Sequence, residues 1–194
     1  MKITTQNTWL ERMARSPRSD HSRNRWSVRK TILIVVEGAD EEGFLKHVRS
    51  IFVPRDCGIS VTIRNAKGKG ADHVLRKALT EKARSSYDKV AAMYDTDTEN
   101  PRSVLKNNAL NKRIILLRSE PCLEATLIKL VGEDPYAVNT DWKTRVESLL
   151  NGYPPRDHRA DWSKVTAGIL RNQRSHLSVI DHLLNLLDIH PPVP

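Results

Sequence analysis

The chain has 194 residues, of which 39% are hydrophobic, and it carries a net charge of +9. This length fits one domain, or one domain with an extension, and the apolar content is enough to bury a core. No stretch approaches the roughly 18 consecutive apolar residues of a membrane helix, and the Arg-rich start does not resemble a secretory signal peptide, so we expect a cytoplasmic protein that does not bind membranes.

The positive charge is concentrated at the start of the chain. Residues 1–30 hold eight Lys and Arg, Arg29 and Lys30 among them, against two acidic residues, which gives this segment a net charge of +6. Because residues 1–29 mix Arg, Ser, Asn and Pro with only scattered apolar positions, we expect a basic, partly disordered arm. Such an arm is suited to gathering a nucleic acid, but a solubilising tail without a partner has the same composition, and the charge alone leaves both interpretations open.

Residues 30–132 are typical of an α/β domain, because apolar runs that resemble buried strands alternate with amphipathic helices. We expect strands at about 31–36, 59–63, 89–94 and 114–117, and helices at about 40–52, 70–85 and 119–132. This alternation implies right-handed crossovers and a central, mostly parallel four-stranded sheet flanked by helices. In the last of these helices, Pro121 is expected in the first turn and Ser119 as the N-cap.

Residues 133–194 are expected to form a helical C-terminal extension packed on the same domain. A short helix at about 140–150 is followed by a Pro-rich turn at 153–155 and a helical tail at about 162–187. The tail repeats leucine and isoleucine at helical spacing, which indicates packing against the core or a partner and is compatible with a homodimer.

Acidic residues follow two of the expected strands directly. Glu37 and Gly38 come after the first strand, and the run 95–99 after the third contributes Asp95, Asp97 and Glu99. Because ligands bind outside the carboxyl ends of the strands in open α/β sheets, we expect these carboxylates to converge. Such a cluster repels itself unless a cation neutralises it, and hard oxygen ligands suit Mg²⁺ or Mn²⁺. The alternative is an ordinary acidic turn, since Asp, Asn and Thr are common turn residues.

A divalent ion beside a basic arm is suited to phosphodiester chemistry, because the ion activates water and stabilises the leaving oxygen. Two lysines, Lys67 and Lys69, lie in a Lys-Gly-Lys-Gly run that is either a phosphate-binding turn at a helix start or a basic surface turn. His158 and Lys164 are weaker candidates for the path of the substrate. The two cysteines, Cys57 and Cys122, lack the spacing of a zinc site or a disulfide framework.

Two blocks of this sequence carry a resemblance to a known superfamily. The segment VVEGADEE at 35–42, followed by DTDTE at 95–99, resembles the Toprim domain shared by topoisomerases, bacterial primases, OLD-family nucleases and small ribonucleases. Within that superfamily, SEPCLE at 119–124 is similar to the Ser-Asn-Pro-Cys-Phe-Glu segment of RloB-like proteins, although Glu120 replaces the Asn and Leu123 the Phe. The likeness spans about residues 28–185.

The resemblance implies a Toprim-like Rossmannoid fold and a set of roles. Glu37 would act as a general acid/base or metal ligand, Asp95 and Asp97 would hold Mg²⁺, and Glu99 would support them. Glu124 would join this site, although it could equally be a carboxylate on an exposed helix face.

The function implied is that of a metal-dependent nuclease acting on DNA or RNA in phage defence or restriction, together with a partner protein from the same defence system. The alternative is a non-catalytic partner that binds nucleic acid or an effector on a Toprim scaffold. Topoisomerase activity is not expected, because the chain lacks room for strand-passage domains.

Overall fold

The computed structural model describes residues 28–97, 100–137 and 141–189. Four strands and seven helices follow one another within these residues: β1 Lys30–Val36, α1 Ala39–Phe52, β2 Ile59–Asn65, α2 Gly70–Arg84, β3 Lys89–Asp95, α3 Ser103–Asn111, β4 Ile114–Ser119, α4 Leu123–Leu130, α5 Trp142–Leu149, α6 Ala167–Gln173 and α7 Ser178–Leu186. None of the helices within these ranges has the length and apolar character needed to cross a bilayer.

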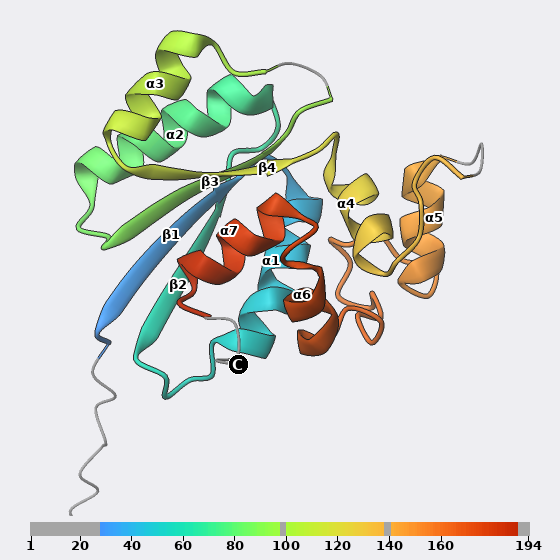
Figure 1. Cartoon of the computed structure of the whole chain (residues 1–194). Helices are drawn as coiled ribbons and strands as arrows, with labels where there is room; N and C mark the ends of the chain where they lie inside the picture. Colours follow the sequence, from blue (N-terminus) through green and yellow to red (C-terminus); the bar gives the residue numbers. More distant parts are fainter. Residues whose placement is uncertain (1–27, 98–99, 138–140, 190–194) are drawn as a thin grey trace, which may run out of the picture.

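The four strands form one parallel sheet in the order β2-β1-β3-β4 (Figure 1). The central strand β1 is buried on both faces, which explains why its residues 32–36 are all apolar. The predicted α/β fold with a four-stranded sheet is therefore confirmed, and the order of the strands is consistent with a Rossmann-like fold.

Helices cover both faces of the sheet (Figure 1). On β1, Leu33 and Val35 point towards a cluster with α2 and α3, whereas Ile32, Ile34 and Val36 point towards a cluster with α1 and the C-terminal helices. This alternation is the two-residue period of a strand, and each fully buried Leu or Ile contributes about 1.5–3 kcal/mol to stability.

The C-terminal helices pack on the face that α1 covers. Leu183 and Leu184 of α7 belong to the same buried cluster as Phe44 of α1. The segment before α6 also lies against α1, because a Cβ atom on Gly43 would come within 2.0 Å of the Pro155 carbonyl oxygen. Glycine at position 43 is thus required by this close approach. The repeated apolar residues of the tail therefore serve the core of this chain.

Three local expectations differ from the structure. The segment between β3 and β4 contains α3, a helix that the sequence pattern did not reveal. Pro121 lies outside α4 and follows a cis peptide bond, so Cys122 is the N-cap and Ser119 is the last residue of β4. The tail is two helices, α6 and α7, separated by a turn at 174–176.

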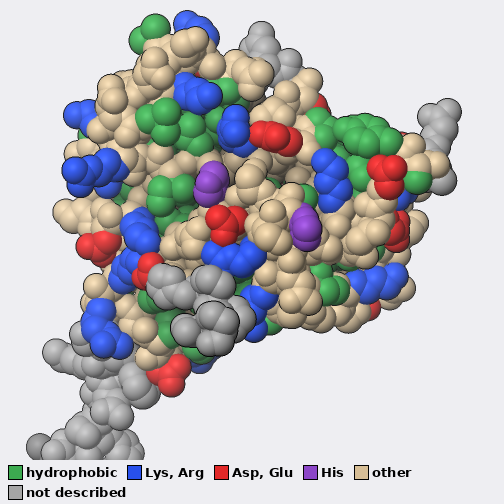
Figure 2. Space-filling model, viewed as in Figure 1, with side chains coloured by type: hydrophobic (Ala, Val, Ile, Leu, Met, Phe, Trp, Pro, Cys, Tyr) green, Lys and Arg blue, Asp and Glu red, His purple; other side chains and the backbone are tan. Residues whose placement is uncertain are grey.

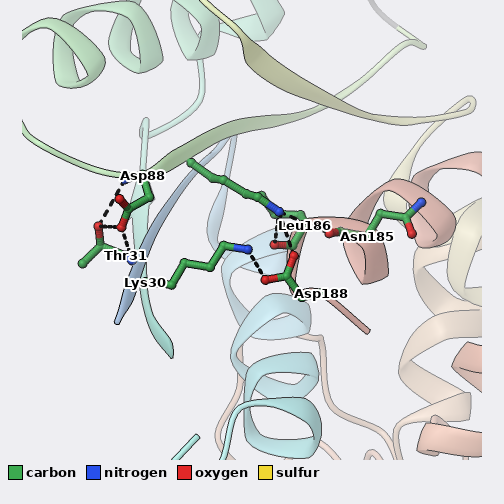
Figure 3. Close-up of polar contacts among 7 residues, drawn as sticks. Lys30, Thr31, Asp88, Asn185, Leu186 and Asp188 are labelled. Atoms are coloured by element: carbon green, nitrogen blue, oxygen red, sulfur yellow. Dashed lines mark hydrogen bonds and ion pairs between the residues drawn. The ribbon is translucent and has the colours of Figure 1, made fainter. Parts of the chain in front are cut away.

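A carboxylate joins the end of the tail to the start of the sheet (Figure 3). Asp188, just after α7, pairs with Lys30 at the start of β1 and with Lys89 at the start of β3, the latter at 2.9 Å. Hydrogen bonds from Lys30 and Lys89 hold the pKa of the Asp188 carboxyl below its ordinary value. The contribution to stability is present above the ordinary pKa and is lost as the pH falls through the lowered one.

We expect Asp188→Asn to lower the free energy of unfolding by about 0.5–1 kcal/mol, a small value because solvent screens this partly exposed group. Asparagine tolerates the left-handed backbone at this position, where φ is 59°, so the change removes the charge without straining the turn. Denaturant unfolding at neutral pH measures the effect. Asp56→Asn, in the exposed turn after α1, is the control, and equal stability of both variants would contradict the expectation.

Candidate functional site

The candidate site lies at the carboxyl ends of β1 and β3, two neighbouring strands whose following helices cover opposite faces of the sheet. After β1 the chain enters α1 on one face, and after β3 it leads to α3 on the other face. The strands β1 and β3 are neighbours, with Val36 opposite Met93, so Glu37, which follows β1, lies near Asp95, the last residue of β3. This position is the topological switch point at which open α/β sheets bind their ligands.

Asp95 is at the centre of a group of carboxylates. Burial, and then the negative charges of Glu41, Glu124, Asp97 and Glu37, raise the pKa of its carboxyl to about 8. The backbone N–H of Leu123, in the first turn of α4, donates to Asp95 Oδ1 at 3.1 Å. The negative charges of four further carboxylates thus act on Asp95, and a hydrogen bond from a helix N-terminus stabilises its own carboxyl group.

Glu37 and Glu41 occupy the β1 side of the group. Glu37 Oε2 is buried and has no hydrogen-bond partner among the described residues. Glu41 Oε2 accepts a hydrogen bond of 2.9 Å from the Gly38 N–H, and burial raises the pKa of the Glu41 carboxyl. Glu41 is not among the site residues predicted from the sequence. Its signal was available, because a glutamate three residues after an N-cap is typical of a capping box.

The β4 side of the group is formed by the start of α4. Glu124 lies in the first turn of α4, close enough for its charge to act on both Asp95 and the Cys122 thiol. Glu124 is therefore near the other carboxylates, and its role in the site stays a prediction. Burial, together with the nearby carboxylates, raises the pKa of Cys122 to about 12, so this thiol stays protonated and is a poor nucleophile.

The lysines of the Lys-Gly-Lys-Gly run lie next to Glu37. The Gly68 N–H donates to the Glu37 carbonyl oxygen at 2.8 Å, which fixes this loop against the end of β1. Lys67, Gly68, Lys69 and Gly70 all have positive φ, between 66° and 79°, and both lysine side chains are exposed. The loop thereby places two lysines at the carboxyl end of the sheet, where the carboxylates also lie.

Other candidates lie elsewhere or outside the described residues. Arg29 and Lys30 are at the opposite end of β1, whose seven residues span about 20 Å. Lys164 lines a separate hollow of about 230 Å³ with Arg145 and Glu133. His158 lines another, of about 380 Å³, beside α1. Glu99 and most of the basic arm lie outside the described residues.

Figure 2 shows Lys and Arg side chains interspersed with Asp and Glu on the face in view. On this face, the described residues do not form a broad basic surface.

The side chains of the site offer the type of donor atom that a hard divalent cation binds. Carboxylate oxygens are the ligands that Mg²⁺ and Mn²⁺ prefer, and the buried Glu37 oxygen lacks a partner among the described residues. Within those residues, no three His, Cys, Asp or Glu side chains stand as a group that could hold a metal ion. The carboxylates near Asp95 thus interact electrostatically, but among the described residues they do not form a complete set of metal ligands.

Comparisons with protein-family models, curated proteins and solved structures found no match for this chain.

The high pKa of Asp95 predicts a dependence of stability on pH in the absence of metal. Asp95 ionises near pH 4 in the unfolded chain but keeps its proton up to about pH 8 in the folded protein. Between these values the folded state binds more protons, so stability falls as the pH rises from about 4 to about 8. Asp95→Asn keeps the oxygen that accepts from Leu123 and removes the charge.

We therefore expect the Asn variant to melt above the wild type at pH 9 in EDTA, by about 2–4 °C for each kcal/mol gained. Thermal unfolding followed from pH 5 to pH 9 makes the comparison. A variant that melts at or below the wild type across this range would show that Asp95 is not destabilised by its neighbours.

Proposed function

We propose that this protein is a metal-dependent nuclease that hydrolyses phosphodiester bonds of DNA or RNA. The observation that carries the proposal is the gathering of Glu37, Glu41, Asp97 and Glu124 around Asp95 at the switch point of the sheet. Repulsion among these groups disfavours the charged state in the protein alone and favours binding of a divalent cation. The resemblance of residues 35–42, 95–99 and 119–124 to Toprim and RloB-like segments supports the same function.

Each side chain has a role in this proposal. Glu37, Asp95 and Asp97 would hold Mg²⁺ or Mn²⁺, with Glu99 and Glu124 in support. The ion, when bound, supplies a nucleophilic water and offsets the negative charge of the phosphate. Leu123 orients the Asp95 carboxylate through its N–H, and Glu37, which follows β1, would accept or return a proton. Lys67 and Lys69 would contact phosphates of the substrate beside Glu37.

We place this activity in the cytoplasm, in a phage-defence or restriction setting with a partner protein of that system. This setting rests on the resemblance and on the two cysteines, Cys57 and Cys122, which are unpaired with each other.

The second candidate is a non-catalytic partner that binds nucleic acid or an effector. The observation in its favour is the net charge of +6 on residues 1–30, which is sufficient for binding without metal. Deletion of residues 1–27 separates the two candidates. Binding collapses if the arm carries the whole function, whereas a weakened, salt-sensitive cleavage persists if the carboxylates are catalytic.

Cleavage assays test the proposed chemistry. We expect Glu37→Gln and Asp95→Asn each to lower Mg²⁺- or Mn²⁺-dependent cleavage of DNA or RNA by about 10²–10⁴-fold, because each removes a ligand or a proton acceptor while preserving shape. Asp56→Asn, at the other end of the sheet, serves as the matched control and should cut like the wild type. If the wild type cuts neither nucleic acid, or both variants cut normally, the nuclease proposal is wrong.

Metal binding has a readout that is independent of activity. A ligand that binds only the folded state stabilises it by about 2.7 kcal/mol at a concentration of 100 times its Kd. We expect Mn²⁺ and Mg²⁺ to raise the Tm of the wild type, and Asp95→Asn to show a much smaller rise. Identical shifts in the two proteins would place the bound metal elsewhere.

A further inference from the structure

A hollow lies beside the carboxylate site, at the ends of β3 and β4. It has a volume of about 510 Å³, opens to solvent, and is lined by Thr96, Asn100, Arg118, Glu120, Lys129 and Tyr136. We call it the β4–α4 hollow. None of its cationic or aromatic residues has a role in the site described above.

The hollow adjoins the carboxylate site along the chain, because Thr96, which lines it, is the residue after Asp95. The Thr96 N–H donates to the carbonyl oxygens of Ser119 and Pro121, at 3.2 and 2.8 Å. These two hydrogen bonds join the end of β3 to the segment between β4 and α4. The backbone that carries Asp95 thus forms part of the lining of the hollow.

Tyr136 offers a stacking surface on the wall of the hollow. Its side chain is 66% exposed, and it is the only aromatic residue among the exposed large hydrophobic residues of the described chain. Trp142 packs edge-on against the Tyr136 ring, with ring centroids 5.7 Å apart. The Trp142 Nε1–H donates to the Pro135 carbonyl oxygen, which fixes the indole beside this ring. A flat aromatic surface that is braced yet exposed is suited to stacking against a planar ligand.

The same hollow carries a net positive charge. Arg118 is paired with Glu120 at 3.3 Å, and Lys129 donates to the Glu120 carbonyl oxygen at 3.2 Å. Within the described chain Lys129 makes no ion pair, so its charge is available to an anionic ligand. A planar group on Tyr136 and an anionic group on Lys129 would thus be recognised together.

We propose that the β4–α4 hollow binds one unpaired nucleotide of a single-stranded nucleic acid, next to the phosphodiester bond that is cleaved. The base stacks on Tyr136 and the phosphate contacts Lys129 and Arg118. This inference rests on the proposed nuclease function and specifies its substrate. A base in a duplex is covered by its neighbours, whereas an unpaired base can lay its face on an aromatic side chain. The volume lies within the range of about 300–1,000 Å³ that is typical of small-ligand sites.

Binding of labelled oligonucleotides to the full chain tests this inference. Fluorescence anisotropy is measured in EDTA, which prevents metal-dependent cleavage, with 12-nucleotide single-stranded DNA, the same sequence as RNA, and the matched duplex. We expect Tyr136→Ala to weaken single-strand binding about tenfold and duplex binding much less, because stacking of one base is lost. Tyr136→Phe keeps the ring and should bind as the wild type does.

The contribution of Lys129 to binding is tested in the same assay. Lys129→Gln should weaken binding and reduce the slope of log K against log salt concentration by about 1, as expected for one lost phosphate contact. Lys112→Gln is the matched control, because Lys112 is exposed and precedes β4, at the opposite end of this strand from the hollow. Thermal melting of each variant checks that the fold is retained.

The outcomes separate this inference from the proposed function. Normal cleavage by the wild type, with single-strand affinity unchanged in Tyr136→Ala, overturns the hollow as a nucleotide site and leaves the nuclease intact. Loss of single-strand affinity in Tyr136→Ala, in a protein that cuts no nucleic acid with Mg²⁺ or Mn²⁺, supports the hollow and refutes the nuclease. Equal losses of single-strand and duplex affinity also overturn the inference, because they exclude stacking of an unpaired base.

Discussion

Repulsion among carboxylates at the carboxyl ends of the central strands is the constraint on which this account of the molecule depends. The topology leaves no alternative placement for Glu37 and Asp95, because they end adjacent strands whose following helices cover opposite faces. Asp95 is partly buried there and the negative charges of four other carboxylates act on it, so its charged form is unfavourable in the protein alone. Titratable groups whose pKa is strongly shifted by burial and neighbouring charges are frequent at functional sites.

The surrounding structure relieves this repulsion only in part. The N–H groups of Leu123 and Gly38, each at the start of a helix, bind one carboxylate oxygen of Asp95 and Glu41 respectively. No comparable donor among the described residues reaches Glu37 Oε2. The cation that the proposal requires would supply the compensation that these hydrogen bonds leave incomplete. The nearby hollow with Tyr136 and Lys129 would then bind the strand that delivers the phosphate.

Much of the fold could be predicted from the sequence, because buried strands and amphipathic helices carry strong periodic signals. The helix α3 could not, since it buries only Ala109 and exposes Val104 and Leu110, so its apolar pattern is weak. The start of α4 was misplaced because proline usually marks a first helical turn, whereas Pro121 here precedes the N-cap. The ends of the predicted strands identified Glu37, Asp95 and Asp97, and the capping-box spacing could have identified Glu41. Tyr136 becomes a candidate only because the fold brings it beside segments that are distant in sequence.

Anomalous diffraction from crystals soaked in Mn²⁺ tests the central claim most directly. The account predicts a Mn²⁺ peak in contact with carboxylate oxygens of Glu37 and Asp95 in the wild type, and loss of that peak in Glu37→Gln. A wild-type crystal that binds Mn²⁺ only at other places, or whose peak at the switch point is unchanged in the variant, would contradict it.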